Sequence, residues 1–92
     1  MEMKHFSRIF SALANPVRLK ILSIVSETKR PLHIKAVAEV LNMDYAAVYR
    51  HVGLLEKAGL LQVYEVGRSR VLSPLHVDLM KQVFSLVEQI KA

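Results

Sequence analysis

Residues 44–60, DYAAVYRHVGLLEKAGL, run without a break into residues 61–70, LQVYEVGRSR. The apolar positions of the first segment recur at the spacing of one buried helix face: Val48, Val52, Leu55 and Ala58. Asp44 is suited to cap the start of this helix, and Gly59 is suited to end it in a left-handed conformation. The second segment is predicted to be a hairpin that turns at Gly67. A helix with one polar face, followed at once by an arginine-tipped hairpin, decides the fold.

Three further helices are predicted before this stretch. Apolar residues at helical spacing indicate a helix over residues 4–13, and the pair Asn15-Pro16 caps and begins a second, largely apolar helix. Residues 34–41 resume the helical spacing and stop at a tight turn before Asp44. Two short helices joined by a tight turn form the helix-turn-helix pattern.

A final helix is predicted over about residues 75–91. It carries a stripe of apolar side chains that is wider than the core of a small monomer needs: Leu79, Met80, Val83, Phe84, Leu86, Val87 and Ile90. The predicted hairpin occupies residues 61–72. The sequence thus predicts a single domain over residues 1–92, mainly α with a small β-hairpin. This is a winged helix-turn-helix of about five helices and a two-stranded wing.

The composition limits what the chain can do. Its 92 residues, 52% of them hydrophobic, allow one compact core, and 13 Lys and Arg against 8 Asp and Glu leave a formal charge of +5. This charge favours an anionic partner, although ordinary solubilising charge has the same sign. The absence of cysteine excludes disulfides, thiolate metal sites and thiol redox sensing. Because there is no run of 18 apolar residues and no signal-peptide pattern, we expect a cytoplasmic protein with no membrane partner.

The helix that follows Asp44 presents a face suited to reading DNA. Opposite its buried stripe stand five residues: Tyr45, Ala46, Tyr49, Arg50 and Gly53. An arginine forms paired hydrogen bonds with guanine or holds a phosphate, and tyrosines contact phosphates, base edges or thymine methyl groups. His51 is expected to be packed or to face a phosphate. We therefore predict a DNA-binding set on this helix: Tyr45, Ala46, Tyr49, Arg50 and His51.

A purely structural role stays open for these side chains. Tyr45 and Tyr49 are spaced to stack over neighbouring side chains, and Arg50 is placed to pair with Glu56 or Glu39 as a solvated charge.

The predicted wing carries a second group of candidate DNA contacts. Arg68, Ser69 and Arg70 follow the turn residue with only Glu65 nearby, so the two guanidinium groups are expected to project from the hairpin tip. Such a tip suits a minor groove or the adjacent phosphates, and the alternative is a solvated turn. Three more cations precede the helix pair and either reach the DNA backbone or are plain surface: Lys29, Arg30 and Lys35.

Three segments together carry a resemblance to a known family. They are FSALANPVRLKILSIV from Phe10, AVAEVLNMDYAAVYRHVGLLEKAGLL from Ala36 and VYEVGRSRVLSPL from Val63. Within about residues 5–76 they resemble the ArsR/SmtB-type winged-helix transcriptional regulators of bacteria and archaea. The resemblance implies a five-helix winged domain that dimerises through its first and last helices and usually represses its own or a neighbouring operon. The implied interface is Phe6, Ile9, Phe10, Leu79, Met80, Val83, Phe84, Val87 and Ile90, on the helices near 4–13 and 75–91.

The chain departs from this family at the usual metal sites. The third helix reads VAEV at residues 37–40, where metal-sensing relatives carry a Cys-x-Cys-type motif. In the last helix His76 and Asp78 stand in the reverse order of the family's zinc pair, and Gln89 and Ala92 replace the second pair. The sequence therefore predicts no metal and no cofactor, with ligation by His76 and Asp78 across a dimer as the alternative.

Two functions are compatible with these observations. The first is a homodimeric, sequence-specific repressor that reads a near-palindromic operator in duplex DNA. Its helix over 44–58 enters the major groove, and its wing over 61–72 lies on the minor groove or on phosphates. The second is a winged-helix module that docks a protein through Tyr45 and Tyr49. An enzyme is not expected, because the sequence has no Gly-rich phosphate loop and no spaced catalytic grouping. The sequence does not identify an effector.

Overall fold

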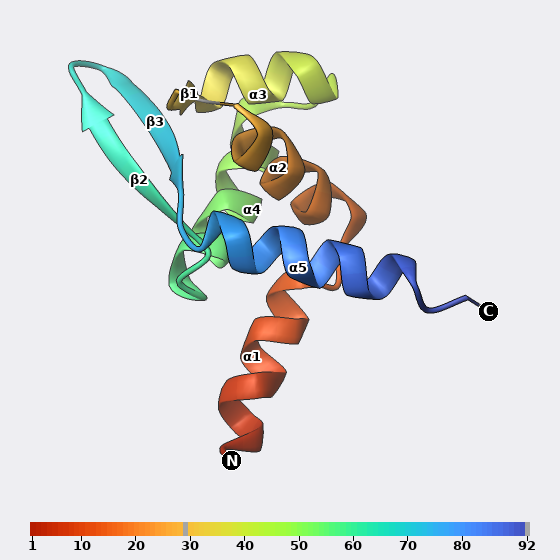
Figure 1. Ribbon diagram of the computed structural model, residues 1–92. Coiled ribbons are helices and arrows are strands. Elements are labelled where there is room, and N and C mark those ends of the chain that lie inside the picture. The colour runs from red at the N-terminus through yellow and green to blue at the C-terminus, as the bar shows by residue number, and fades with distance from the viewer. Residues whose placement is uncertain (29, 92) are drawn as a thin grey trace.

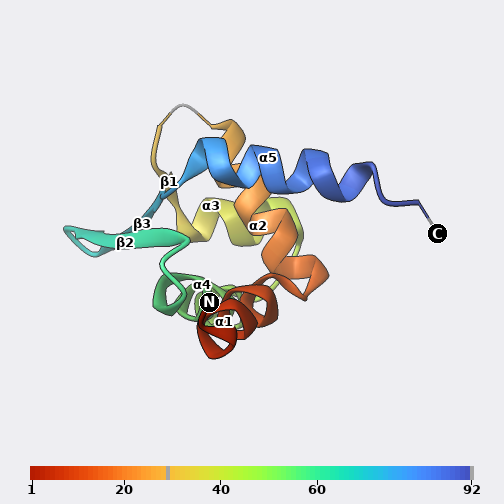
Figure 2. The same cartoon turned by 60° about the horizontal axis from the view of Figure 1, so that its bottom comes forward.

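The computed structural model describes residues 1–28 and 30–91 of the chain. In chain order these residues form α1, α2, β1, α3, α4, β2, β3 and α5 (Figure 1). The helices α2, α3 and α4 gather at the base of a small sheet, and α5 lies across α2 (Figures 1 and 2). The predicted winged helix-turn-helix, with five helices and a β-hairpin, is confirmed.

The first two helices meet at a sharp turn. α1 (Met3–Leu13) and α2 (Pro16–Glu27) are bent by 85° relative to each other. Asn15 begins α2 as predicted, because its side-chain oxygen accepts hydrogen bonds from the N–H groups of Val17 and Arg18 at 2.8 and 3.2 Å. This turn points the N-terminal part of α1 away from the core, while Ala12 and Leu13 at its other end are buried (Figure 1).

The helix-turn-helix pair is α3 (Ile34–Leu41) and α4 (Tyr45–Lys57). α3 ends at Asn42, which takes a left-handed conformation with φ of 54°. Asp44 stands at the N-cap position of α4, but its side chain accepts no capping hydrogen bond. The prediction that Asp44 caps through hydrogen bonding is therefore wrong, although its charge still suits the positive end of the helix dipole.

The sheet has one strand more than the sequence predicts. β2 (Leu61–Val66) and β3 (Ser69–Pro74) pair antiparallel and are joined by two turn residues, the first being Gly67 with φ of 62°. β1 (Leu32–His33) pairs with the other edge of β3, which gives the order β1-β3-β2. A strand of two residues is too short to show an alternating pattern, so sequence reasoning had no signal for it.

The last helix, α5 (Val77–Glu88), starts after His76, which has a φ of 56°. Both views show the second half of α5 extending beyond the other elements (Figures 1 and 2). Met80, implied by the family resemblance as an interface residue, is only 6% exposed because it packs in the core of its own chain. Val83 and Phe84 are partly buried against the same core.

One connected cluster of buried side chains holds the elements together, and every helix contributes to it. Its largest fully buried members come from α2, α3, α4 and the base of the sheet: Ile21, Leu22, Ile34, Leu55, Leu61 and Leu72. Each such side chain contributes about 1.5–3 kcal/mol when it leaves water. The cluster therefore fixes α4 and the sheet relative to each other, which positions the candidate site.

No single helix within the described residues is long and apolar enough to cross a membrane, and only the bent pair of α1 and α2 together has the length and composition of a span. In that pair Ile21, Leu22 and Val25 of α2 are buried in the protein core.

Candidate nucleic-acid interface

The centre of the candidate interface is the side of α4 that faces away from the core. Val48, Val52 and Leu55 are fully buried. Helical geometry places four exposed or half-buried residues on the opposite side: Ala46, Arg50, Gly53 and Lys57. We term these four residues the outer face. Because two of them have little or no side chain, the backbone of α4 can approach a groove closely, while Arg50 and Lys57 supply positive charge.

The predicted DNA-binding set of α4 divides between three sides of the helix. Ala46 and Arg50 lie on the outer face. Tyr45 and Tyr49, 39% and 42% exposed, lie on the side toward the wing, and their rings stack at 6.3 Å between centroids with 19° between planes. His51 is half-buried on the other side of the helix. The structure therefore separates residues that the sequence placed in one group.

Arg50 points its charge outward. The single ion pair found within the described residues joins Arg70 to Glu65, so the alternative pairing of Arg50 with Glu56 or Glu39 is absent there. Arg50 is exposed, which leaves its guanidinium available to a base or a phosphate.

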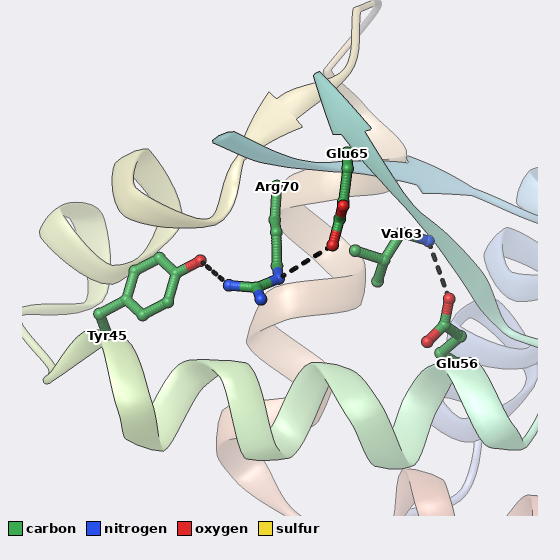
Figure 3. A network of polar contacts seen from close by, with 5 residues as sticks. All are labelled: Tyr45, Glu56, Val63, Glu65 and Arg70. Atoms are coloured by element: carbon green, nitrogen blue, oxygen red, sulfur yellow. Dashed lines mark hydrogen bonds and ion pairs between the residues drawn. The ribbon is translucent and has the colours of Figure 1, made fainter. Parts of the chain in front are cut away.

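Arg70 does not project from the tip of the wing. Its guanidinium returns to α4, where Nη1 donates a hydrogen bond to the Tyr45 hydroxyl at 3.4 Å and Cζ lies 4.6 Å from the centroid of the Tyr49 ring (Figure 3). Its Nε is 4.0 Å from Oε1 of Glu65 on the paired strand. The hydrogen bond to Tyr45, and then the electrostatic interaction with Tyr49, raise the pKa of Arg70. The expectation fails because Arg70 pairs with Glu65 inside the strand ladder, not in the turn.

A second contact ties the wing to α4. The carboxylate of Glu56 accepts a hydrogen bond of 3.1 Å from the backbone N–H of Val63 in β2 (Figure 3). Together with Arg70, this contact holds the hairpin beside the helix at two places. The wing and the outer face therefore form one surface.

On the opposite side of α4, Arg18 joins three helices. Its Nε donates to the carbonyl of Ala12 at 2.6 Å, its Nη2 donates to the carbonyl of Ser11 at 3.2 Å, and its Nη1 is 3.2 Å from Nδ1 of His51. Because a guanidinium only donates, Nδ1 accepts and the His51 ring is neutral in this contact. Burial lowers the pKa of His51, and the positive charges of Arg18 and Arg50 lower it further. Sequence reasoning missed this pair because its members are far apart in the chain.

A basic hollow lies at the N-terminal end of α4, between the wing and the start of α3. Its lining is His33, Lys35, Tyr45, Arg68, Ser69 and Arg70. We term it the N-terminal hollow. It brings the three predicted wing residues together with Lys35, and no carboxylate occurs among its described lining residues. His33 was not predicted, since only the pairing of β1 with β3 brings it there.

Two further residues, Lys29 and Arg30, were predicted to contact the DNA backbone. Arg30 is exposed before β1, outside the lining, and Lys29 lies outside the residues that the structure describes. Across residues 1–28 and 30–91, no three His, Asp or Glu side chains lie close enough together to hold a metal ion.

Comparison with known sequences gives two matches. A family model described as a helix-turn-helix domain matches residues 13–64, which is more than half of the chain. An uncharacterized HTH-type transcriptional regulator of Methanocaldococcus jannaschii is 36% identical over 62 residues. That alignment covers 67% of this chain, and the chain spans 63% of the length of this curated relative.

Solved structures share the whole fold. The homodimeric winged helix-turn-helix DNA-binding domain of a possible ArsR-family regulator from Mycobacterium bovis is similar, with a TM-score of 0.79 and 23% identity over 94% of this chain and 77% of that one. HlyU from Vibrio cholerae has a TM-score of 0.80 at 19% identity, covering 97% of this chain and all of that one. NolR from Sinorhizobium fredii has a TM-score of 0.77 at 24% identity, covering 94% and 84%. The resemblance to winged-helix regulators stated from the sequence is confirmed.

Proposed function

Because this chain belongs to the helix-turn-helix domain family of DNA-binding transcriptional regulators, we propose that it is a homodimeric, sequence-specific repressor. In this proposal the outer face of α4 reads base edges in the major groove, and the N-terminal hollow holds the neighbouring phosphates. The DNA partner in this proposal is the chromosome, so the protein acts in the cytoplasm. The family and fold are those of DNA-binding regulators, not of enzymes.

The observation that carries the proposal is that an exposed Arg50 and the N-terminal hollow, whose described lining holds no carboxylate, lie at the N-terminal half of α4 and the wing. Arg50 itself lines the neighbouring hollow between α4 and the wing, where Glu56 and Glu65 stand beside Arg70. Arg50 is exposed on the outer face, and Lys35, Arg68 and Arg70 converge at the N-terminal end of the same helix. Each of these charges attracts a phosphate, while the guanidinium of Arg50 can form paired hydrogen bonds with a base edge. Side chains for positioning and for reading are therefore present on one surface.

Exposed apolar side chains support the dimer. Phe10 of α1 is 64% exposed, and Leu79 and Leu86 of α5 are 54% and 60% exposed. Helical spacing puts these two α5 residues on one side of that helix. Ile90, two residues beyond the end of α5, is 78% exposed. The similar domain from Mycobacterium bovis is homodimeric. A dimer built through α1 and α5 would place two recognition helices on successive major grooves, about 34 Å apart.

Selection of random duplexes by the purified protein, followed by sequencing, tests this function. We expect a near-palindromic site. Arg50→Ala should reduce discrimination between selected and random duplexes, while Arg68→Ala should weaken binding to both alike and make it less dependent on salt. Tight binding that survives replacement of Arg50, Arg68 and Arg70 together would refute this assignment of contacts. Repression itself is tested by transcription in vitro from a promoter that carries the selected site, which added protein should lower.

The alternative, a protein partner docked on Tyr45 and Tyr49, is less well supported. Arg70 already lies over the Tyr49 ring and bonds the Tyr45 hydroxyl, so these rings do not offer a free apolar face. A stoichiometric protein partner in a pull-down, together with no selected DNA site, would favour this alternative.

A further inference from the structure

A second basic hollow lies at the opposite end of α4, where no predicted contact falls. It is formed where α1 and α2 meet the last turn of α4, and its lining includes Ser7, Arg8, Ser11, Arg18, Leu54 and Lys57. We term it the C-terminal hollow. Figure 2 shows α1 and α4 on the same side of the molecule, opposite α5, with the wing extending to another side.

The charge of this hollow suits an anion. It gathers two arginines and one lysine, and its described lining contains no carboxylate. The groove between α2 and α5 differs, because Glu27 and Glu88 stand there beside Lys81. The C-terminal end of α4 carries a partial charge of about −0.5 from the helix dipole, which three full positive charges outweigh. The N-terminal and C-terminal hollows, each with three Lys or Arg side chains and no carboxylate in its described lining, thus stand at the two ends of α4.

The side chains of this hollow differ in how freely they can bind. Arg18 is engaged with the carbonyl groups at the end of α1 and with His51. Arg8 and Lys57 are exposed. Leu54 is 49% exposed between them and offers an apolar surface to a sugar ring. The groups available to a ligand are therefore the two exposed cations and the neighbouring serine hydroxyls.

The hollow stays open in the proposed dimer. α1 is amphipathic, and helical spacing places Phe6 and Phe10 on one side and Ser7, Arg8 and Ser11 on the other. The apolar side is the one available to a second copy. The polar side faces the end of α4.

The length of α4 fits two DNA strands. From Tyr45 to Lys57 the helix rises about 18 Å, whereas the major groove is about 12 Å wide. A helix of this length that crosses the groove obliquely brings its two ends to the two backbones that border it. In the proposed function, the N-terminal hollow contacts one of these two backbones.

We propose that the C-terminal hollow is a second phosphate-binding site, in which Arg8 and Lys57 contact the strand opposite to the one held by the N-terminal hollow. This inference rests on the proposed function. It assigns α1, beyond its place in the dimer, a direct part in DNA binding. The recognition helix is then clamped at both ends, which fixes its depth and its register in the groove.

Salt-dependent binding to a fluorescent duplex of about 30 base pairs, three helical turns, tests the contact. Between about 50 and 200 mM salt, Arg8→Ala and Lys57→Ala should each make the log–log slope less steep by about 0.9 per bound protomer, and the double variant by about twice that. Lys81→Ala is the matched control, because it removes an exposed cation from a groove that holds carboxylates, and its slope should match wild type. Unfolding midpoints of all variants verify that they fold.

Phosphate-ethylation interference on a selected duplex tests the strand assignment. Ethylation of a phosphate should no longer weaken binding in the variant that lacks the side chain contacting that phosphate. The phosphates identified in this way with Arg8→Ala should lie across the groove from those identified with Arg68→Ala. If wild type binds and Arg68→Ala weakens binding, while Arg8→Ala and Lys57→Ala behave as Lys81→Ala does, the second site is wrong and the proposed function stands. The second site is equally wrong if both sets of phosphates lie on one strand. If wild type binds no duplex, the proposed function itself fails.

Discussion

At the scale of single residues, Arg70 links the wing to α4. It meets Tyr45, Tyr49 and Glu65 and also lines the N-terminal hollow. A guanidinium over an aromatic ring is attracted to the electron-rich face of that ring. Arg70 is therefore a positioning residue for the wing as well as a source of charge.

These two roles can be separated with Arg70→Lys. An ammonium keeps the charge but cannot bond Tyr45 and cover Tyr49 with one planar group. We expect the salt slope of duplex binding to stay as in wild type, while hydrogen exchange of the β2–β3 amides becomes faster. Arg68→Lys is the control, since Arg68 is a turn residue, and it should change neither quantity. Unchanged exchange in Arg70→Lys would show that Arg70 does not position the wing.

His51 gives the stability a dependence on pH. Burial and the charges of Arg18 and Arg50 lower its pKa in the folded state, against an ordinary value of 6.5 in the unfolded chain. The folded state thus binds fewer protons, so the contribution of His51 is fully present above pH 6.5 and is lost as pH falls through the lowered pKa.

Urea unfolding of wild type and of His51→Gln across this pH range measures the effect. The amide oxygen of Gln accepts from Arg18 without titrating, so the variant should lose less stability than wild type as pH drops below 6.5. His5→Gln, on the exposed side of α1, should keep the wild-type profile. Parallel profiles for wild type and His51→Gln would contradict the role given to His51.

At the scale of elements, the helix boundaries follow local rules and the wing does not. Asn15 with Pro16 starts α2, and Gly59, with φ of 78°, follows the end of α4, as their chemistry predicts. The hairpin turns at Gly67 as predicted. Its place against α4, however, depends on Arg70 and Glu56, whose partners lie in other elements.

Gly53 in the middle of α4 lowers the stability of the helix but leaves room for DNA at the outer face. A Cβ at Gly53 would meet nothing within 4 Å, so Gly53→Ala fits the fold. We expect it to stabilise the protein by about 0.5–1 kcal/mol, because glycine is a poor helix former. The added methyl lies on the side proposed to face DNA, so affinity for the selected duplex should fall.

Urea unfolding and duplex binding of Gly53→Ala measure these opposite changes. Gly67→Ala is an informative comparison, because its positive φ of 62° strains any side chain and should lower stability by about 1–2 kcal/mol. A more stable Gly53→Ala protein that binds DNA as tightly as wild type would place the outer face away from the groove.

At the scale of the whole molecule, the exposed apolar side chains of α1 and α5 are the surface through which we propose that two copies pair. We expect Leu86→Lys to produce a monomer, because it places a charge on the exposed apolar side of α5. Val40→Lys is the matched control, since Val40 is 70% exposed on α3 and receives the same charge. Sedimentation measures the mass, and duplex binding should be weaker in Leu86→Lys than in Val40→Lys. Equal masses for the two variants would rule out a dimer through α5.

Much of this protein is determined by its sequence alone. Helix periods, caps and glycine positions specify five helices and a hairpin, because each depends on residues a few places apart. Arg50 could be predicted as an outward charge for the same reason, since its position relative to the buried stripe of α4 follows from helical spacing. The excess of positive charge pointed to an anionic partner without locating it.

Only the tertiary structure decided which distant groups meet. The pairing of β1 with β3, the return of Arg70 onto Tyr49 and the bond between Arg18 and His51 join segments that no local pattern connects. Met80 could not be assigned to the core from its stripe, because periodicity shows that a face is apolar but not what covers it. The hollow lined by Arg8 and Lys57 could not be located from the sequence either. Charges far apart in the chain become one site only when packing of the core brings α1 beside the end of α4.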